Sequence, residues 1–487
     1  MEFLRKNLSI YTLYLVMILT AYLYGGLRLI SIFSLFTVSL AAFIFAFYPF
    51  NTLEKSNKNL KKLLKFPPFY FCIFFSLYVL IQILNPSANM VKLDGGFSCN
   101  LLEYNKLLPS GILSEYIDKS IFEAFLSMLS VFFAMLTVWL SFRNFKKLNN
   151  LCLVASYAGT LLAILSILNY ALPSLGIFSY IDKSIYNPSG SFFYHAHGNA
   201  FFICILGFIG IAIANSISFK NSWKNSSLIL ILCLFIVAFA ITISGGATGA
   251  LLAAFIVPSI LINAVFAFKK SKRLPIFISL SLCSVIAIAL LFALIQTSSA
   301  MQNAFKRISS RTENLSAHFE NRNSIKKVSL DMISSGGDFS VFEKKSKPDY
   351  SKIIFGRGLN SYEPLSESYS IYNNPSFMHY NAWATQKKTS RTIKFAHCDP
   401  LQVTFEFGLL GISIIGIWIL WYIISLCKTG RKNFNLIASG LISMIAIIAY
   451  SFNDNIFYNP FVALNFAVLS IVVFALKSSL QNPAKND

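Results

Sequence analysis

Apolar stretches of about 20 residues recur along the chain, and each is long enough to cross the roughly 30 Å of hydrocarbon in a membrane. The pattern predicts an all-α polytopic membrane protein with about twelve transmembrane helices. The predicted spans are residues 8–24, 28–49, 67–86, 121–142, 151–171, 199–218, 226–243, 247–268, 274–296, 401–426, 434–451 and 460–479. Two of these spans flank Ser244-Gly245-Gly246 and lie unusually close together.

The longest polar segment divides the chain into three parts. Residues 1–296 hold the first nine predicted spans, residues 297–400 form one large connection, and residues 401–487 hold the last three spans. A structureless connection of that length is uncommon in a compact protein. We therefore expect one large, partly helical, folded loop outside the membrane.

The charged residues are few, and most of them are positive. They make up 13% of the chain against 55% hydrophobic residues, and 41 Lys and Arg against 20 Asp and Glu give a net charge of +21. In a soluble protein this excess would suggest nucleic acid as a partner. With the N-terminus in the cytoplasm, the inner segments carry +18, the short outer segments −2 and the large loop +6. The positive-inside rule then predicts two cytoplasmic termini, the lipid bilayer as partner and no nucleic acid.

The end of the large loop contains a candidate catalytic histidine. His397 stands two residues before Asp399-Pro400, a pair that fits the N-cap and first position of the next helix. The positive end of that helix disfavours imidazolium, so it favours the neutral ring, which can accept a proton. The alternative is an ordinary solvated loop histidine.

A carboxylate lies inside the same predicted span. Glu406 is followed by Gly408 and Gly411, which share one helical face and would allow another helix to approach closely. An ionisable residue within a span is a candidate for a functional site. Glu406 either anchors the loop or takes part in such a site.

The large loop offers candidate anion-binding arginines. Apolar positions from Ile325 to Ile333 have helical spacing and end before Gly336-Gly337, so we expect Arg322 at or just before a helix N-terminus, where an anion is favoured. A surface arginine is the alternative. Downstream, Gly356-Arg357-Gly358 allows a tight backbone approach, and Arg391 adds another cation. The basic loop suits an anionic lipid headgroup, although solvation alone would also explain its charge.

Two further features of the sequence could form a metal site or a disulfide. The sequence His195-Ala196-His197 has no third ligand of suitable spacing nearby, so we expect no metal, and the neighbouring aromatic residues fit an interfacial belt. Cys99 and Cys398 lie in outer loops, where they either form a disulfide or remain two free thiols.

The chain resembles the bacterial O-antigen ligase and polymerase superfamily. The strongest match is His397, followed nine residues later by Glu406 and then Gly408-Leu409-Leu410-Gly411, directly after a long outer loop. The other matching residues are Gly190 to Asn199 with Ala200, Ser244-Gly245-Gly246, Arg322, Gly356 and Gly358. The resemblance covers roughly residues 185–425 in motifs and the whole chain in its layout of spans.

The resemblance implies a GT-C-type glycosyltransferase of the bacterial inner membrane that needs neither a metal nor another cofactor. Its donor would be a glycan on undecaprenyl diphosphate, and its acceptor would be lipid A-core in a ligase or the next repeat unit in a polymerase. His397 would be the base or orienting group for the acceptor hydroxyl, and Arg322 would bind the diphosphate. Substrate contacts would also fall to Glu406, His197 and Asn199.

The sequence departs from the family at three positions. The family commonly has arginines where this chain has Asn187 and Gly245, and an asparagine where it has Cys398. A second diphosphate-binding arginine would then come from Arg357 or Arg391.

Two other classes of function remain open. A transporter of lipid-linked oligosaccharides would be expected to show repeated halves, broken helices and charges near the middle of the membrane. The predicted spans are nearly free of such charges, and the polar residues are concentrated in the large loop. A purely structural membrane protein is the third interpretation.

Overall fold

The computed structural model describes most of the hydrophobic chain and the parts of the large loop that pack against it. The described residues are 7–22, 29–47, 53–93, 96–114, 121–142, 144–171, 195–218, 224–270, 278, 282, 315–334, 349–362, 365–366, 395–427 and 431–481.

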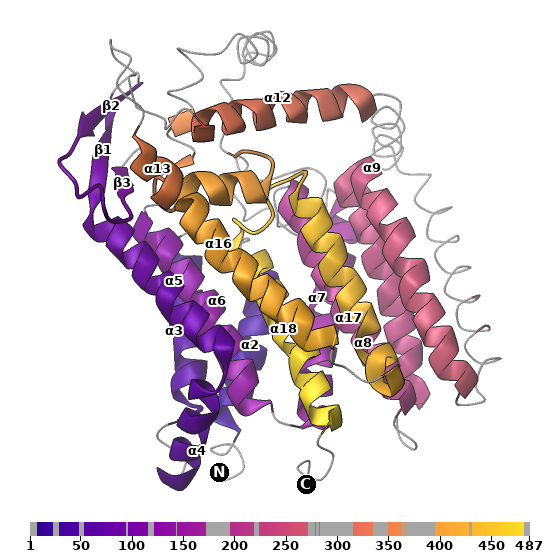
Figure 1. Cartoon of the computed structure of the whole chain (residues 1–487). Helices are drawn as coiled ribbons and strands as arrows, with labels where there is room; N and C mark the ends of the chain where they lie inside the picture. Colours follow the sequence, from indigo (N-terminus) through magenta and orange to yellow (C-terminus); the bar gives the residue numbers. More distant parts are fainter. Residues whose placement is uncertain are drawn as a thin grey trace.

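These residues form a bundle of apolar helices (Figure 1). Six helices are long and apolar enough to cross a membrane: α5 (Pro67–Leu84), α6 (Ile121–Ser141), α7 (Phe145–Ala171), α8 (His195–Ser218), α16 (Asp399–Cys427) and α18 (Pro460–Gln481). Shorter apolar stretches of 10–17 residues occur in α2 (Leu8–Tyr22), α3 (Leu29–Ile44), α9 (Lys224–Lys270) and α17 (Arg431–Ser451). The chain is therefore a predominantly helical membrane protein, as predicted, while the number of twelve spans stays a prediction because most of 274–296 lies outside the described residues.

The two closely spaced spans around Ser244-Gly245-Gly246 belong to a single helical element, α9. A Cβ at Gly249 would lie under 3.0 Å from the carbonyl oxygen of Ile241. In a straight helix, residues eight apart are separated by about 12 Å, so the chain must reverse between them. The apolar segments Ile229–Ile243 and Leu251–Phe266 are the two arms of this reversal.

The centre of the bundle is α8. Its 18-residue segment Asn199–Ser216 is entirely buried, and it packs against α7, α9, α17 and α18. Close packing between helices in a membrane relies on small residues. Gly210 is one such residue, since a Cβ there would lie under 3.0 Å from the Cβ of Ser439 on α17.

A small three-stranded sheet, which was not predicted, accompanies the helices. It consists of β1 (Pro86–Leu93), β2 (Gly96–Leu101) and β3 (Gly111–Ser114) in the order β2-β1-β3, with β1 antiparallel to β2 and parallel to β3. Its sequence alternates apolar and polar positions too weakly to predict strands, and the sheet forms because the chain leaving α5 folds back on itself.

One end of the bundle carries an additional layer, which we call the α12 end. Helix α12 (Leu315–Ser334) lies across it, beside the sheet and α13 (Tyr350–Phe355), whereas α4 (Leu53–Leu64), the start of α2 and the end of α18 lie at the opposite end (Figure 1). A second apolar core holds the α12 end together. It comprises Ala88, Ile112, Ile325, Val328, Met332, Tyr362, Leu365, Ala396 and Phe405.

Candidate functional site

Helix α16 is broken near the α12 end. Gly408 has φ 65° and ψ −173°, which splits α16 into a short segment before it and a long segment after it. A helix that ends leaves its last carbonyl groups without intrahelical partners. Here the amides of Arg357 and Gly358 donate to the carbonyls of Phe405 (3.1 Å) and Glu406 (2.9 Å).

Two side chains of α5 donate further hydrogen bonds to the backbone carbonyls at this break. The Tyr78 hydroxyl lies 2.8 Å from the carbonyl oxygens of Phe407 and Phe355, and Gln82 Nε2 donates to the carbonyl of Glu406 at 3.0 Å. The buried polar backbone at the break is therefore satisfied by groups from two other elements, as a membrane environment requires.

The glycines around Arg357 allow this backbone contact. A Cβ on Gly356 (φ 72°) would lie under 3.0 Å from the carbonyl oxygen of Glu406, and one on Gly408 under 3.0 Å from that of Ile354. The prediction that another helix approaches closely is confirmed at Gly408, where Ile354 at the end of α13 and the amide of Gly356 lie against the glycine. It is wrong at Gly411, where the neighbour is Phe407 of α16 itself.

Arg357 lies inside this junction and is 2% exposed. Its Nη2 donates to the carbonyl of Met332 on α12 at 2.8 Å, and its guanidinium lies 4.5 Å from the centre of the Phe405 ring. These contacts give Arg357 a structural role in joining α12 to α16. Its part in substrate binding stays a prediction.

Glu406 is fully buried and joins three segments. Its Oε2 accepts from the amide of Asn360 and from the Tyr458 hydroxyl, both at 2.9 Å, and its Oε1 accepts from Gln402 Nε2 at 3.1 Å. Burial, together with the nearby Glu406 carboxylate, raises the pKa of Tyr458 well above its usual value, so the phenol stays a donor. Of the two interpretations of Glu406, this geometry favours the structural anchor.

Replacing Glu406 with glutamine should destabilise the protein. The new amide group would place a donor against groups that already donate, and an unsatisfied buried polar group costs about 1–3 kcal/mol. We expect Glu406→Gln to lower the thermal unfolding midpoint in detergent, whereas Glu103→Gln, at an exposed position of the connection after β2, should leave it unchanged. Equal midpoints for the two variants would contradict the anchoring role.

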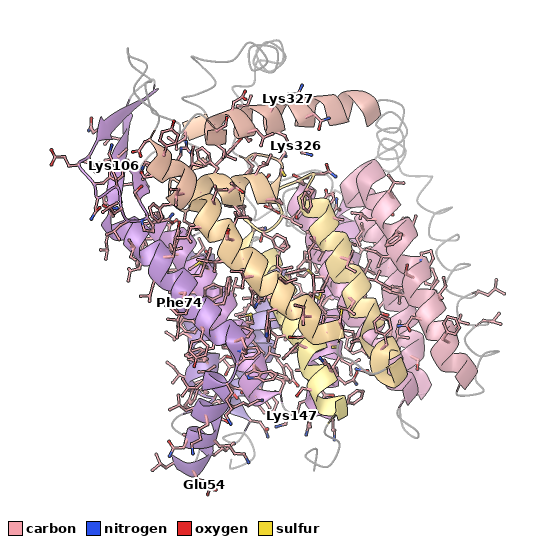
Figure 2. All side chains as sticks on the ribbon, in the orientation of Figure 1. Glu54, Phe74, Lys106, Lys147, Lys326 and Lys327 are labelled. Atoms are coloured by element: carbon pink, nitrogen blue, oxygen red, sulfur yellow. The ribbon has the colours of Figure 1, made fainter. Side chains whose placement is uncertain are left out.

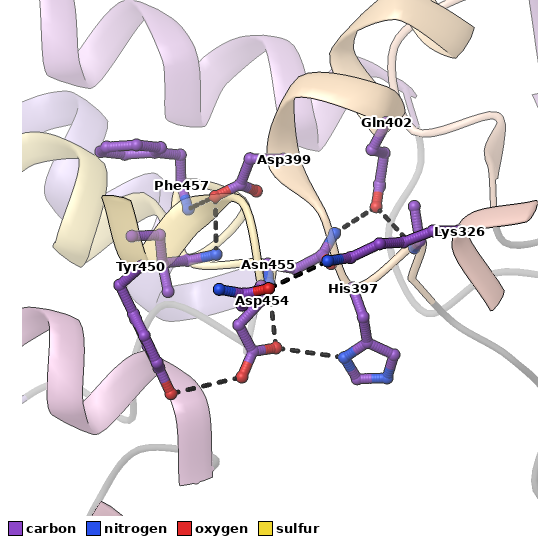
Figure 3. A network of polar contacts seen from close by, with 11 residues as sticks. Lys326, His397, Asp399, Gln402, Tyr450, Asp454, Asn455 and Phe457 are labelled. Carbon is purple, nitrogen blue, oxygen red and sulfur yellow. Dashed lines mark hydrogen bonds and ion pairs between the residues drawn. The ribbon is translucent and has the colours of Figure 1, made fainter. Parts of the chain in front are cut away.

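The candidate active site is a histidine–carboxylate pair beside this anchor. His397 Nδ1 lies 3.1 Å from Asp454 Oδ1, and the two side chains are 34% and 4% exposed (Figure 3). Because an ionised carboxylate only accepts hydrogen bonds, Nδ1 donates and Nε2 keeps its lone pair. His397 also has φ 49°, a left-handed conformation that is uncommon for residues other than glycine and is often found at functional sites.

The connection between α17 and α18 holds Asp454 in place. Asp454 Oδ1 accepts from the amide of Asn455 at 2.9 Å, and Oδ2 lies 3.4 Å from the Tyr450 hydroxyl. Asp399 Oδ2 accepts from the amides of Ile456 (2.9 Å) and Phe457 (3.3 Å) in the same connection (Figure 3).

This placement corrects the prediction that Asp399 caps its own helix. The first helical hydrogen bond runs from the Gln402 amide to the carbonyl of Cys398, so the helix begins one residue earlier than predicted, and the Asp399 carboxylate is used to bind the connection. The sequence prediction of His397 just ahead of the helix is otherwise confirmed.

A cation from α12 reaches the same place. Lys326 Nζ donates to Asn453 Oδ1 at 2.9 Å, next to Asp454 in the sequence (Figure 3). Gln402 Oε1 accepts from the Ala396 amide at 3.2 Å and from Asn455 Nδ2. Ala396 precedes His397 and Asn455 follows Asp454, so Gln402 holds the neighbours of both members of the pair. The site therefore combines a proton acceptor with a nearby ammonium group.

The structure places the predicted arginines differently from the expectation. Arg322 lies inside α12, which begins at Leu315, so its predicted position at a helix N-terminus is wrong, although the end of this helix at Ser334 is confirmed. The side chain of Arg322 lies outside the described part of the chain, as does the whole of Arg391. The substrate contacts predicted for them stay predictions.

The remaining predicted residues fall on α8 and at the start of α16. His197 is in the first turn of α8, and its side chain is outside the described residues, whereas Asn199 is 1% exposed in the helix. Cys398 is a free, buried thiol, so the disulfide with Cys99 is not formed. Burial raises the pKa of the Cys398 thiol, which makes it a poor nucleophile.

Sequence reasoning missed Asp454, Tyr450 and Lys326. In the sequence, Asp454 is one charge of a short outer segment. Its only signal is its place between Asn453 and Asn455, in a polar connection on the same predicted side of the membrane as the large loop.

Among the described residues, no group of three or more His, Cys, Asp or Glu side chains is placed to hold a metal ion. No protein-family model and no curated protein matches this chain.

Proposed function

We propose that this protein is a membrane-embedded transferase that moves a glycan from undecaprenyl diphosphate to an acceptor hydroxyl at the α12 end of the bundle. The observation that carries the proposal is the pairing of His397 with the buried Asp454 at the edge of the bundle. A carboxylate that fixes the ring leaves Nε2 as a base, and the partly exposed ring can be reached by a hydroxyl group.

The reaction is a single displacement. The acceptor oxygen bonds to the anomeric carbon of the donor sugar while its proton passes to His397 Nε2. The bond between that carbon and the diphosphate oxygen breaks, and the lipid diphosphate leaves with the electron pair. Asp454 stabilises the imidazolium that forms, in the way a buried carboxylate supports a catalytic histidine.

A diphosphate leaving group requires cations more than it requires a general acid. Lys326 supplies one cation beside the histidine pair, where its ammonium group donates to the neutral side-chain amide of Asn453. Arg322 and Arg391 remain candidates for further contacts with the diphosphate. No cofactor takes part in this chemistry.

The proposal includes the sidedness predicted from the charges. The α12 end would face the periplasm, both termini would lie in the cytoplasm, and twelve spans would cross the bacterial inner membrane. Glycans on undecaprenyl diphosphate and lipid A-core would meet the site on that face.

The acceptor decides between two activities of this class. We favour a ligase that transfers the polymer to lipid A-core, with a polymerase that joins repeat units as the alternative. Deleting the gene and separating lipopolysaccharide on a gel distinguishes them. Loss of polymer from lipid A-core with accumulation of lipid-linked polymer supports the ligase, a single-repeat pattern supports the polymerase, and an unchanged pattern contradicts both.

A further inference from the structure

Helix α4, at the end opposite α12, is attached to the bundle along one side. Asn59 and Leu63 are buried on that side, and Asn59 Nδ2 donates to the carbonyl of Ala46 at 2.7 Å. Lys62 Nζ donates to the carbonyl of Trp139 and lies 4.5 Å from the centre of its ring. These contacts fix the orientation of the two remaining sides of α4.

One of these sides is an exposed stripe of leucines. Leu53, Leu60 and Leu64 are 79%, 47% and 46% exposed. At about 100° per residue, their side chains fall within about 40° of one another around the helix. The described part of the chain leaves this stripe uncovered, and contiguous apolar surface of this kind marks an interaction with a membrane or another protein.

The stripe is continuous with the outer face of α5, one of the candidate membrane spans. On that face Tyr70, Phe74 and Leu77 are 43%, 62% and 49% exposed, and the Tyr70 hydroxyl donates to the carbonyl of Leu64 at 2.8 Å. Phe74 points away from the bundle, and Glu54 marks α4 at the far end from Lys326 and Lys327 (Figure 2). The hydrocarbon that covers α5 therefore reaches the leucine stripe.

Helix α4 ends where the candidate span α5 begins. It stops at Leu64, two residues before the buried Phe66, whose ring stacks on Trp139 with centroids 4.3 Å apart. Because α5 starts at Pro67, the leucines and lysines of α4 lie next to the end of a candidate membrane span.

The third side of α4 is basic. Lys58, Lys61 and Lys65 are exposed and lie about 80–140° around the helix from the centre of the leucine stripe. Five lysines occur between positions 55 and 65, and Glu54 is the neighbouring acidic residue. We propose that α4 lies in the headgroup layer of the membrane and that Lys58, Lys61 and Lys65 bind the headgroups of anionic phospholipids. A basic amphipathic helix beside a span has the chemistry for this.

The lipid preference can be tested on the purified full chain in detergent micelles. Phosphatidylglycerol is titrated against phosphatidylcholine, and the thermal unfolding midpoint is recorded. Each lysine near an anionic surface changes affinity about fivefold. We expect the double variant Lys58→Gln/Lys61→Gln to need about tenfold or more phosphatidylglycerol for the same rise in the unfolding midpoint. The double variant Lys106→Gln/Lys327→Gln, with the same change in charge, should need no more than the unsubstituted protein. An equal response of the two double variants would overturn the proposal.

The depth of the leucine stripe can be tested in vesicles of phosphatidylglycerol and phosphatidylcholine with brominated acyl chains. The fluorescence of Leu60→Trp and Lys58→Trp is compared with that of the unsubstituted protein. We expect the added tryptophan to be quenched by the brominated chains at position 60 and by aqueous acrylamide at position 58. Acrylamide quenching without lipid quenching at both positions would place α4 in water and overturn the proposal.

Discussion

Replacing His397 with alanine is expected to lower the rate of glycan transfer by about 10²–10⁴-fold, the usual contribution of a positioned acid–base group. Asp454→Asn should cost a similar factor, because an asparagine can donate to Nδ1 and so favours the tautomer that has its proton on Nε2. The rate is measured with purified protein, a lipid-linked glycan donor and an acceptor.

These two variants need a control that separates chemistry from folding. Asp331→Asn makes the same chemical change at an exposed position of α12, and it should keep the full rate. His397→Ala and Asp331→Asn should retain the thermal unfolding midpoint within a few degrees. Asp454→Asn should lower the midpoint about as much as Glu406→Gln, because its amide also replaces a buried carboxylate that accepts hydrogen bonds. Full activity of His397→Ala would remove the proposed base.

Replacing Gly408 with alanine is expected to have the largest effect on stability. The residue has φ 65°, which costs an L-amino acid about 1–2 kcal/mol, and a Cβ would lie under 3.0 Å from the backbone of Ile354 and Gly356. Neither backbone can move without losing the hydrogen bonds at the break. We expect Gly408→Ala to fail to accumulate as a folded protein in the membrane or to unfold many degrees lower.

The matched control for this change is eight residues further along the same helix. Nothing lies within 4 Å of a Cβ built on Gly416, so Gly416→Ala should be neutral or stabilise the helix by up to about 1 kcal/mol. Yields and unfolding midpoints of the two variants are compared in the same detergent. Similar values for both would contradict the close backbone contact at Gly408.

The sequence was sufficient to predict the helical membrane architecture because hydrocarbon imposes one simple pattern, a long apolar run. It also predicted His397 ahead of a helix and a helix ending at Ser334. The sheet was missed since residues 86–114 lie outside the bundle and carry no clear alternation. The start of α12 was placed too late because its polar first half lacks an apolar stripe, which left Arg322 at the wrong position.

The details of the candidate site depended on contacts between distant segments. Gly356-Arg357-Gly358 and Gly408 each permit several conformations, and their meeting follows only from the packing of α13 against α16. Asp454 lies 57 residues after His397, and no local pattern links the two. The sequence shows that a carboxylate such as Glu406 is unusual within an apolar span. It does not show which three groups donate hydrogen bonds to that carboxylate.

The most direct measurement is a transfer reaction with purified wild-type protein in lipid vesicles. The mixture contains a glycan on undecaprenyl diphosphate, lipid A-core as acceptor and a metal chelator. We expect glycosylated lipid A-core and free undecaprenyl diphosphate in equal amounts, with the product lost in His397→Ala and Asp454→Asn. Folded wild-type protein that forms no product with lipid A-core or with a second lipid-linked repeat unit would contradict the proposed function.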